Sequence, residues 1–201
     1  MPLRIVIVGG VAAGMSAATR ARRMNESASI IVLERSGHVS FANCGLPYYL
    51  NGKIASQEAL LVTTPARLRE RFNIDARVRH EVTRIDRVLK VVEGVNLATG
   101  QQFRLPYDKL ILTPGAAPIV PPTTGVDAPN VKVLRNVEDV LALADLVRPS
   151  ARAVVVGAGY IGLEMAEVLR EAGMSVTVVE KAARPLPLMD PEITAWVGRE
   201  L

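Results

Sequence analysis

Cysteine is nearly absent from this chain of 201 residues, because Cys44 is the only one. A single thiol excludes a disulfide within the chain and suits a reducing compartment. No apolar run approaches the roughly 20 residues that a membrane-spanning helix needs. The short apolar run at the N-terminus enters a glycine-rich turn and not a cleavage site, so no signal peptide is predicted. We therefore expect a cytoplasmic protein that does not bind membranes.

Aromatic residues and a strong charge imbalance are also scarce. Phe, Trp and Tyr make up 4% of the chain, and 24 basic side chains face 20 acidic ones, a formal net charge of +4. The basic residues form no long run and have no aromatic residues interleaved, so we expect no binding of nucleic acid. The mild positive charge suits a polyanionic cofactor, and the apolar content of 49% suits an α/β protein with a core.

A glycine turn near the N-terminus has the pattern of a dinucleotide-binding motif. The β-branched run Leu3–Val8 predicts a buried parallel strand, and a helix should follow to about Met24. Between them lie Gly9, Gly10, Val11, Ala12, Ala13 and Gly14. Such a turn binds a pyrophosphate at the helix N-terminus, although Val11 stands where the general motif has its middle glycine. A second strand, residues 29–33, ends at Glu34, where an acid would bind ribose hydroxyls. The alternative is a structural turn that binds no ligand.

The same arrangement returns after residue 150, with an unbroken G-x-G-x-x-G. A strand at residues 153–156 leads into the second turn, and a helix follows to about Ala172. The turn consists of Gly157, Ala158, Gly159, Tyr160, Ile161 and Gly162. The next strand, residues 176–179, ends at Glu180, whose carboxylate favours a free ribose hydroxyl and therefore NADH. Lys181 and Arg184 lie near enough to leave NADPH open.

The region between the two motifs predicts further strands. A helix is expected from Pro65 to about Phe72 and a strand over residues 74–82. Strand-like runs follow near residues 83–86, 88–95 and 102–105, and a returning strand begins at residue 107. These patterns predict an α/β fold of two Rossmann-like, three-layer dinucleotide-binding domains, the first with an inserted antiparallel β-meander at about residues 82–106.

Domain boundaries follow from proline content and from the repeat. The first domain should span residues 1–118, and residues 119–150 should be a linker with a short helix at Val137–Leu146. The second domain should begin at residue 151. It has only two clear strands before residue 201, too few for a complete sheet, so we expect a truncated domain and a piece of a longer protein.

The segment Ser40–Leu50 carries the only thiol. A lone cysteine is most often a buried apolar residue. Here Cys44 follows an expected loop, and Gly45 and Pro47 suit the start of a helix, whose dipole would favour the thiolate. We therefore predict that Cys44 is a redox nucleophile beside a flavin.

One face of the first predicted helix carries polar side chains. They are Ser16, Arg20 and Arg23, at spacings i, i+4 and i+7. Arginines on one face can hold the phosphates of a substrate, and a solvated surface is the alternative.

The two turns, the segment Ser-Phe-Ala-Asn-Cys-Gly-Leu-Pro-Tyr-Tyr and the strand Tyr-Asp-Lys-Leu-Ile-Leu-x-Pro-Gly-Ala together resemble the flavin disulfide reductase superfamily of pyridine nucleotide-disulfide oxidoreductases. Within it, the cysteine segment is similar to the single-cysteine coenzyme A-disulfide reductases and their persulfide reductase relatives. The resemblance covers essentially the whole chain.

The resemblance implies the cofactors FAD and NADH or NADPH, with coenzyme A as substrate or bound mixed disulfide. FAD would contact Gly9, Gly10, Val11, Ala12, Ala13, Gly14, Glu34, Arg35, Asn43, Cys44, Val82, Thr113, Pro114, Gly115, Ala116 and Arg135. NAD(P)H would contact Gly157, Ala158, Gly159, Tyr160, Ile161, Gly162, Glu164, Glu180 and Lys181. Coenzyme A would contact Ser16, Arg20, Arg23, Ser40, Asn43 and Arg71.

The implied mechanism passes a hydride from NAD(P)H to the flavin and then electrons to a mixed disulfide of Cys44 and coenzyme A. Coenzyme A must supply the other half of that disulfide, because the chain has no second cysteine. The resemblance further implies a homodimeric parent enzyme, a small-molecule disulfide or persulfide substrate, and no metal.

Two alternatives remain open. In an NADH oxidase or peroxidase, Cys44 would cycle through a sulfenic acid. Peroxidase-type members usually carry a histidine in the first glycine turn, where this chain has Val11 and Ala12. The other alternative is a cofactor-binding piece that is catalytically incomplete by itself.

Overall fold

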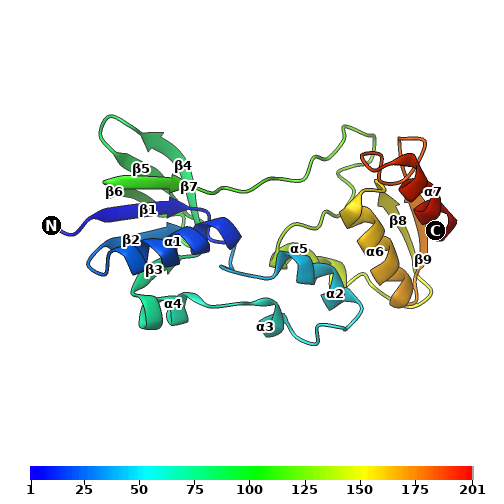
Figure 1. The fold of residues 1–201 in the computed structure, drawn as a ribbon, viewed down its shortest axis with the longest axis horizontal. Coiled ribbons are helices and arrows are strands. Elements are labelled where there is room, and N and C mark those ends of the chain that lie inside the picture. The colour runs from blue at the N-terminus through cyan, green and yellow to red at the C-terminus, as the bar shows by residue number, and fades with distance from the viewer. Residues whose placement is uncertain (201) are drawn as a thin grey trace. The chain divides into compact units, whose positions relative to one another are not determined.

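The computed structural model describes residues 1–200 (Figure 1). By contacts between Cα atoms the chain forms two compact units. Unit 1 contains residues 1–43 and 58–138, and unit 2 contains residues 44–57 and the chain from Asp139 onward. The domain boundaries expected near residues 118 and 150 stay predictions. The contact units differ from them in assigning the Cys44 segment to the second unit.

A four-stranded parallel sheet forms the middle layer of unit 1, in the order β3-β2-β1-β7. Its strands are β1 (Arg4–Val8), β2 (Ser29–Leu33), β3 (Ile74–Arg77) and β7 (Lys109–Leu112). The central strand β1 pairs Val6 with Ile31 on one side and with Leu110 on the other. These runs are apolar and β-branched because parallel strands are buried on both faces.

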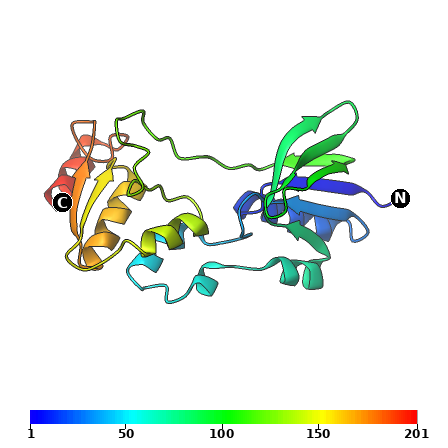
Figure 2. The same ribbon diagram turned by 180° about the vertical axis from the view of Figure 1, so that it is seen from behind.

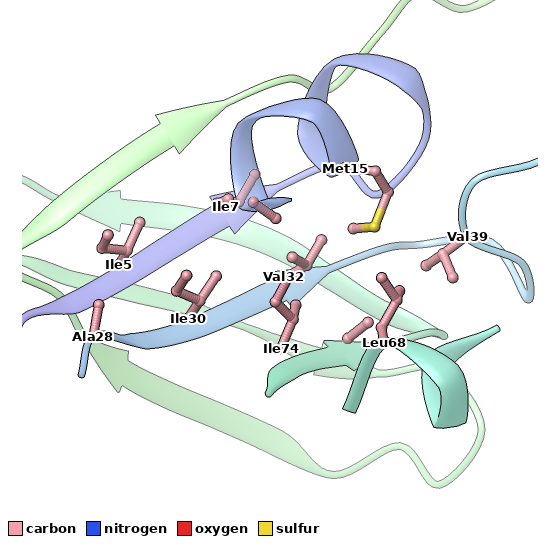
Figure 3. Close-up of a cluster of buried hydrophobic side chains, with 11 residues drawn as sticks. Ile5, Ile7, Met15, Ala28, Ile30, Val32, Val39, Leu68 and Ile74 are labelled. Atoms are coloured by element: carbon pink, nitrogen blue, oxygen red, sulfur yellow. The ribbon is translucent and has the colours of Figure 1, made fainter. Parts of the chain in front are cut away.

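Helices α1 (Ala12–Met24) and α4 (Pro65–Phe72) contribute to the core on one face of this sheet. Figure 3 shows Met15 of α1 and Leu68 of α4 pointing toward the side chains of the strands, among them Ile7 and Val32. Each aliphatic side chain buried in such a core stabilises the fold by roughly 1.5–3 kcal/mol. Both helices end where the sequence predicted. Thr64 begins α4 by accepting a hydrogen bond from the Arg67 backbone N–H.

An antiparallel sheet forms the third layer, in the order β4-β5-β6. Its strands are β4 (His80–Asp86), β5 (Val91–Asn96) and β6 (Gln102–Pro106). A second buried cluster joins Val6 and Leu33 of the parallel sheet to Val92 of β5. From behind, the green strands of this meander lie beside the blue strands of the parallel sheet (Figure 2). The predicted three-layer domain with an inserted meander is therefore confirmed.

One predicted strand is wrong. Residues 74–82 do not form a single strand, because the chain leaves the parallel sheet after Arg77 and joins the antiparallel sheet at His80. Arg79 adopts a left-handed conformation with φ +57°, which turns the backbone between the two sheets. The following run, expected separately at residues 83–86, belongs to the same strand β4. The strand expected at residues 88–95 also begins later than predicted, at Val91, because residues 87–90 form the turn between β4 and β5, with Lys90 at φ +52°.

Unit 2 is built around a pair of parallel strands, β8 (Arg152–Val156) and β9 (Ser175–Val179). Its helices are α2 (Leu46–Leu50), α6 (Tyr160–Glu171) and α7 (Pro191–Glu200), and α5 (Val137–Ala144) begins at the last residues of unit 1. Val154 and Val156 of β8 are 64% and 74% exposed, unlike the buried strands of unit 1. This exposure agrees with the expected incomplete second sheet.

Two short elements flank α2 along the chain, and the sequence did not predict the second of them. A 3₁₀ turn η1 (Asn43–Gly45) precedes α2, and a one-turn helix α3 (Gln57–Leu60) follows it. The sequence predicted the start of α2 but not α3. No helix among residues 1–200 is long and apolar enough to span a bilayer.

Candidate functional site: two dinucleotide turns and an exposed thiol

The first glycine turn has no room for side chains at its first and last glycines. Gly9 has φ +98°, and its N–H donates to the Leu33 carbonyl at 2.8 Å. A Cβ on Gly9 would overlap the carbonyl of Thr113, the residue that directly follows β7. A Cβ on Gly14 would overlap the Gly9 carbonyl. The backbone therefore stays bare at the N-terminus of α1, as close approach to a pyrophosphate requires.

Glu34 at the end of β2 is buried and held in one orientation. Its Oε2 accepts a hydrogen bond from the Gly10 N–H at 2.7 Å, and its Oε1 accepts one from the Ser36 N–H at 2.8 Å. Each carboxylate oxygen keeps further acceptor capacity for hydroxyl donors. This is the arrangement expected for an acid that binds a ribose.

A cavity of about 540 Å³ opens in unit 1 next to this turn. Among its lining residues are these predicted FAD contacts: Val11, Ala12, Ala13, Glu34, Arg35, Asn43, Thr113, Pro114, Gly115, Ala116 and Arg135. Gly9, Gly10, Gly14, Cys44 and Val82 were predicted as well and are not lining residues. Val82 instead packs against the buried cluster of the meander. The bare glycine turn, the fixed Glu34 carboxylate and the cavity fit a dinucleotide.

The cavity also contains residues that the sequence did not indicate. They are Ser36, Phe41, Arg79, Leu97, Asn136 and Glu138. They come from the loop after β2, from the turn between β3 and β4, from the turn after β5 and from the residues around the start of α5. No short motif joins these separated positions, so only their packing identifies them.

Among these residues that the sequence did not indicate, Glu138 has polar contacts with three residues from distant parts of the chain. Its Oε1 accepts a hydrogen bond from the Gly37 N–H at 2.7 Å and lies 3.3 Å from His38 Nδ1 and 3.4 Å from Arg79 Nη2. Burial acts to raise the pKa of Glu138, but the Gly37 N–H and the neighbouring charges outweigh it and lower the pKa. The carboxylate thus stays ionised and joins α5 to the loop after β2.

Arg135 makes a similar long-range connection. Its Nε donates to the Ala116 carbonyl at 2.9 Å, so it ties the chain before α5 to the turn that follows β7. Arg135 and Ala116 both line the cavity.

Cys44 lies in η1, is exposed and forms no disulfide. The alternative that this thiol is a buried apolar residue is therefore wrong. Asn43, the residue before it, lines the cavity of unit 1, and α2 begins two residues after it. The predicted placement of Cys44 ahead of a helix is confirmed.

The predicted coenzyme A residues are surface residues for the most part. Ser16, Arg20 and Arg23 of α1 are exposed, and so is Arg71 of α4. Ser40 is half-buried with φ +49°, and its N–H donates to the Gly10 carbonyl at 2.9 Å. Binding of coenzyme A by these residues stays a prediction.

Arg22 of α1 is also basic, but it points inward and serves structure. Its guanidinium donates to the carbonyls of Phe72 and Asn73 at 2.8 and 2.7 Å. It also reaches the carbonyls of Asn25 and Glu26. Because it satisfies the ends of two helices, we assign it no ligand.

The second glycine turn repeats the geometry of the first. Gly157 has φ +103° and donates to the Val179 carbonyl at 2.7 Å, and a Cβ on Gly162 would overlap the Gly157 carbonyl. Glu180 Oε2 accepts from the Ala158 N–H and Oε1 from the Ala182 N–H, each at 2.7 Å. The Ala182 and Ala158 donors lower the pKa of Glu180.

The remaining predicted coenzyme residues surround this turn. Gly159, Tyr160 and Ile161 are exposed at the start of α6, Glu164 is half-buried, and Lys181 is exposed after β9. The Tyr160 hydroxyl donates to Met189 Sδ at 3.1 Å, a contact that the sequence did not indicate. The chain after β9 therefore returns to the second glycine turn.

Comparisons with known proteins point to one family. The sequence pattern described as pyridine nucleotide-disulphide oxidoreductase matches residues 3–201. The coenzyme A disulfide reductase of Staphylococcus haemolyticus is 36% identical over 200 residues, which are 98% of this chain and 45% of that protein. The chain therefore spans under half the length of this curated relative.

Solved structures agree. Reduced CoADR-RHD of Bacillus anthracis superposes with a TM-score of 0.94 at 43% identity, over 100% of this chain and 36% of that one. An NAD-dependent persulfide reductase from A. fulgidus gives a TM-score of 0.94 at 37% identity, over 99% and 38%. A water-forming NADH oxidase from Lactobacillus brevis gives 0.93 at 33% identity, over 98% and 44%. Because the family pattern matches residues 3–201, nearly the whole chain, the chain belongs to the pyridine nucleotide-disulphide oxidoreductase family.

Proposed function

We propose that this chain is the FAD- and NAD(P)H-binding part of a flavoprotein disulfide reductase. The whole protein would pass electrons from NAD(P)H through FAD to a mixed disulfide of Cys44 and coenzyme A, and so reduce coenzyme A disulfide or a persulfide. One observation carries the proposal. The only thiol of the chain is free and exposed, and it directly follows Asn43, which lines the cavity beside the first glycine turn.

Each part of the chain has a defined task in this proposal. The backbone of residues 9–14 would bind the FAD pyrophosphate, and Glu34 would accept hydrogen bonds from the ribose. The turn at residues 157–162 and Glu180 would do the same for NAD(P)H. When bound, FAD would supply the hydride acceptor that no side chain of the protein provides.

Cys44 would carry the exchange at sulfur. The Cys44 thiolate attacks one sulfur of coenzyme A disulfide, a new S–S bond forms, and one coenzyme A thiolate leaves. Two electrons then cleave the Cys44–coenzyme A disulfide, and with one proton they yield coenzyme A thiol and the Cys44 thiolate. An exposed thiol permits the first attack, and the reducing conditions of a cytoplasm would keep it free.

Coenzyme A as the partner rests on two supports. The relative from Staphylococcus haemolyticus is a coenzyme A disulfide reductase. On this chain, Arg20, Arg23 and Arg71 present exposed guanidinium groups of the kind that bind phosphates. A small-molecule disulfide and a homodimeric parent are parts of the same proposal.

NADH is the proposed coenzyme in preference to NADPH. The two backbone donors at Glu180 keep its carboxylate ionised, and a negative carboxylate repels a 2′-phosphate. Lys181 and Arg184 are the exposed basic residues that would favour NADPH instead.

A second candidate is an NADH oxidase or peroxidase. The 33% identity to the Lactobacillus brevis oxidase favours it. In that function the Cys44 thiolate would be oxidised by a peroxide to a sulfenic acid, with release of water, and then reduced again. A third candidate is a cofactor-binding piece that has no turnover by itself.

Intact mass of the purified chain, before and after a thiol reductant, separates these functions. We expect an adduct of the mass of coenzyme A that is lost on reduction and is absent from Cys44→Ser. A gain of one oxygen on Cys44 would support the oxidase or peroxidase instead. No adduct and no flavin absorbance would support the incomplete piece, and we expect this chain to turn over coenzyme A disulfide poorly in any case.

A further inference from the structure

The Cys44 segment, residues 44–57, belongs to the same compact unit as the second glycine turn and helix α6. Helix α2 lies against α6, which begins at the second glycine turn (Figure 1). Helix α2 has only five residues, so it cannot be stable without contacts to the rest of the unit. What holds this segment therefore also sets the position of the chain that carries Cys44.

The shortest polar contacts between them converge on one carboxylate. Glu171, the last residue of α6, accepts a hydrogen bond from Asn51 Nδ2 at 2.6 Å. It also pairs with Lys53, whose Nζ lies 2.9 Å from Oε1 and 2.8 Å from Oε2. The Lys53 hydrogen bond is the largest cause that lowers the pKa of Glu171, and the same bond raises the pKa of Lys53.

A second contact lies two turns earlier on the same helix. The hydroxyl of Tyr48 lies beside the carboxylate of Glu164, and that interaction raises the pKa of Tyr48. The Lys53 ammonium is 5.6 Å from the centre of the Tyr48 ring. Because residues seven apart share a helix face, the segment contacts one face of α6 at both its beginning and its end.

We propose that Asn51, Lys53 and Glu171 form a positioning contact that holds the Cys44 segment against α6. A coenzyme bound at the second glycine turn then changes the reactivity of Cys44 through this helix. The inference rests on the proposed function, because it takes residues 157–162 as the coenzyme site. Such coupling requires a short element whose local opening is biased by both sites, and α2 has that size.

Alkylation of Cys44 by iodoacetamide tests the contact directly, since the 201-residue chain has no other cysteine. The rate is measured without coenzyme and with NAD⁺, which binds without delivering a hydride. We expect Glu171→Gln to raise the rate without coenzyme about two- to fivefold, the change that loss of one exposed ion pair produces. Lys53→Met should have the same effect, and the double variant should add nothing more.

Glu167→Gln is the matched control. Glu167 lies on the same helix and acts on Lys53 and Tyr48 only through its charge. Its loss should leave the alkylation rate within about 1.5-fold of the wild type. Equal rates for Glu171→Gln and the wild type, or equal changes in Glu167→Gln and Glu171→Gln, would overturn the positioning contact.

Calorimetric titration with NAD⁺ separates the two levels of the proposal. Binding of NAD⁺ that changes the alkylation rate of Cys44 by the same factor in the wild type and in Glu171→Gln would mean that the coupling is wrong. In that case the coenzyme site stands. If NAD⁺ does not bind, the assignment of the coenzyme site fails as well. The rate without coenzyme still judges the contact by itself.

Discussion

The two glycine turns are local copies of each other set in different surroundings. In both, the first glycine has φ near +100°, the last glycine lies against the carbonyl of the first, and an acid accepts from two backbone N–H groups. The surroundings differ at the first glycine. Gly9 is covered by Thr113, whereas among residues 1–200 no atom of another segment would lie within 4 Å of a Cβ on Gly157.

The difference comes from the third strand. In unit 1, β7 pairs with β1 and brings Thr113 over the turn, where its hydroxyl donates to the Val8 carbonyl at 2.9 Å. Among residues 1–200, unit 2 contains the two strands β8 and β9 and no third strand beside them. A strand, a glycine turn and a helix are therefore enough to form this backbone arrangement, and in unit 1 the additional strand β7 covers it.

Alanine at the first glycine of each turn should give the largest contrast. Gly9→Ala adds a Cβ against the Thr113 carbonyl at positive φ, so we expect a loss of roughly 3 kcal/mol or more in the free energy of unfolding. Gly157→Ala meets only the backbone conformation and should cost about 1–2 kcal/mol. Urea denaturation of the two variants measures this, and equal losses would contradict the covering role of β7.

The eighth residue after the last glycine of each turn offers the next contrast. Arg22 is 9% exposed and bonds four carbonyls, whereas Arg170 at the matching place in α6 is exposed. Arg22→Met should lower the free energy of unfolding by about 2–4 kcal/mol, since it leaves the ends of α1 and α4 unsatisfied. Arg170→Met should change it by less than about 0.5 kcal/mol. A small effect of Arg22→Met would show that water can replace the guanidinium.

The two acids test whether the turns bind different nucleotides. Glu34→Gln should weaken the binding of FAD, and Glu180→Gln should weaken the binding of NADH. Each substitution should raise the Kd by roughly 10- to 100-fold. Calorimetry with each nucleotide measures both, and a loss of the same nucleotide in both variants would contradict the assignment.

The pKa of Glu180 adds a pH dependence. Because the Ala182 and Ala158 N–H groups hold this pKa below its ordinary value of 4.5, the carboxylate stays ionised as the pH falls from 7 to 5. The Kd for NADH should therefore be constant over that range and rise only below 4.5. A rise centred near pH 6 would point to another titrating group.

The smallest effect should come from the ion pair between Arg4 of β1 and Asp108, the residue that directly precedes β7. Asp108 pairs with the Arg4 guanidinium at 2.9 Å and accepts from the Arg4 backbone N–H at 2.8 Å, and these two contacts lower the pKa of Asp108 to about 2. The folded-state pKa lies below the ordinary value of 3.8. The stabilisation is therefore present above pH 3.8 and is lost as the pH falls through about 2.

Asp108→Asn should remove the part of the stability loss at low pH that comes from protonation of Asp108. Thermal unfolding from pH 5 to pH 2 measures it, and the variant should be slightly less stable at pH 5 and closer to the wild type at pH 2. An unchanged pH profile would mean that the exposed pair does not contribute.

Short-range patterns in the sequence predict most of the two strand–turn–helix motifs. Both turns, the acids at Glu34 and Glu180, and the ends of α1 and α4 could be predicted because a strand, a glycine turn and a capped helix involve neighbours along the chain. The start of a helix after Cys44 followed from Pro47 in the same way. The incomplete second sheet followed from counting strands.

The contacts between distant segments could not be predicted from the sequence. Glu138 meets Gly37 across 101 residues, Arg22 meets Asn73 across 51, and Lys53 meets Glu171 across 118. The break at Arg79 between two sheets belongs here too, because the apolar pattern continues through it. Such contacts depend on which faces pack together, and one side chain carries the same sequence signal whether it points into the core or into water.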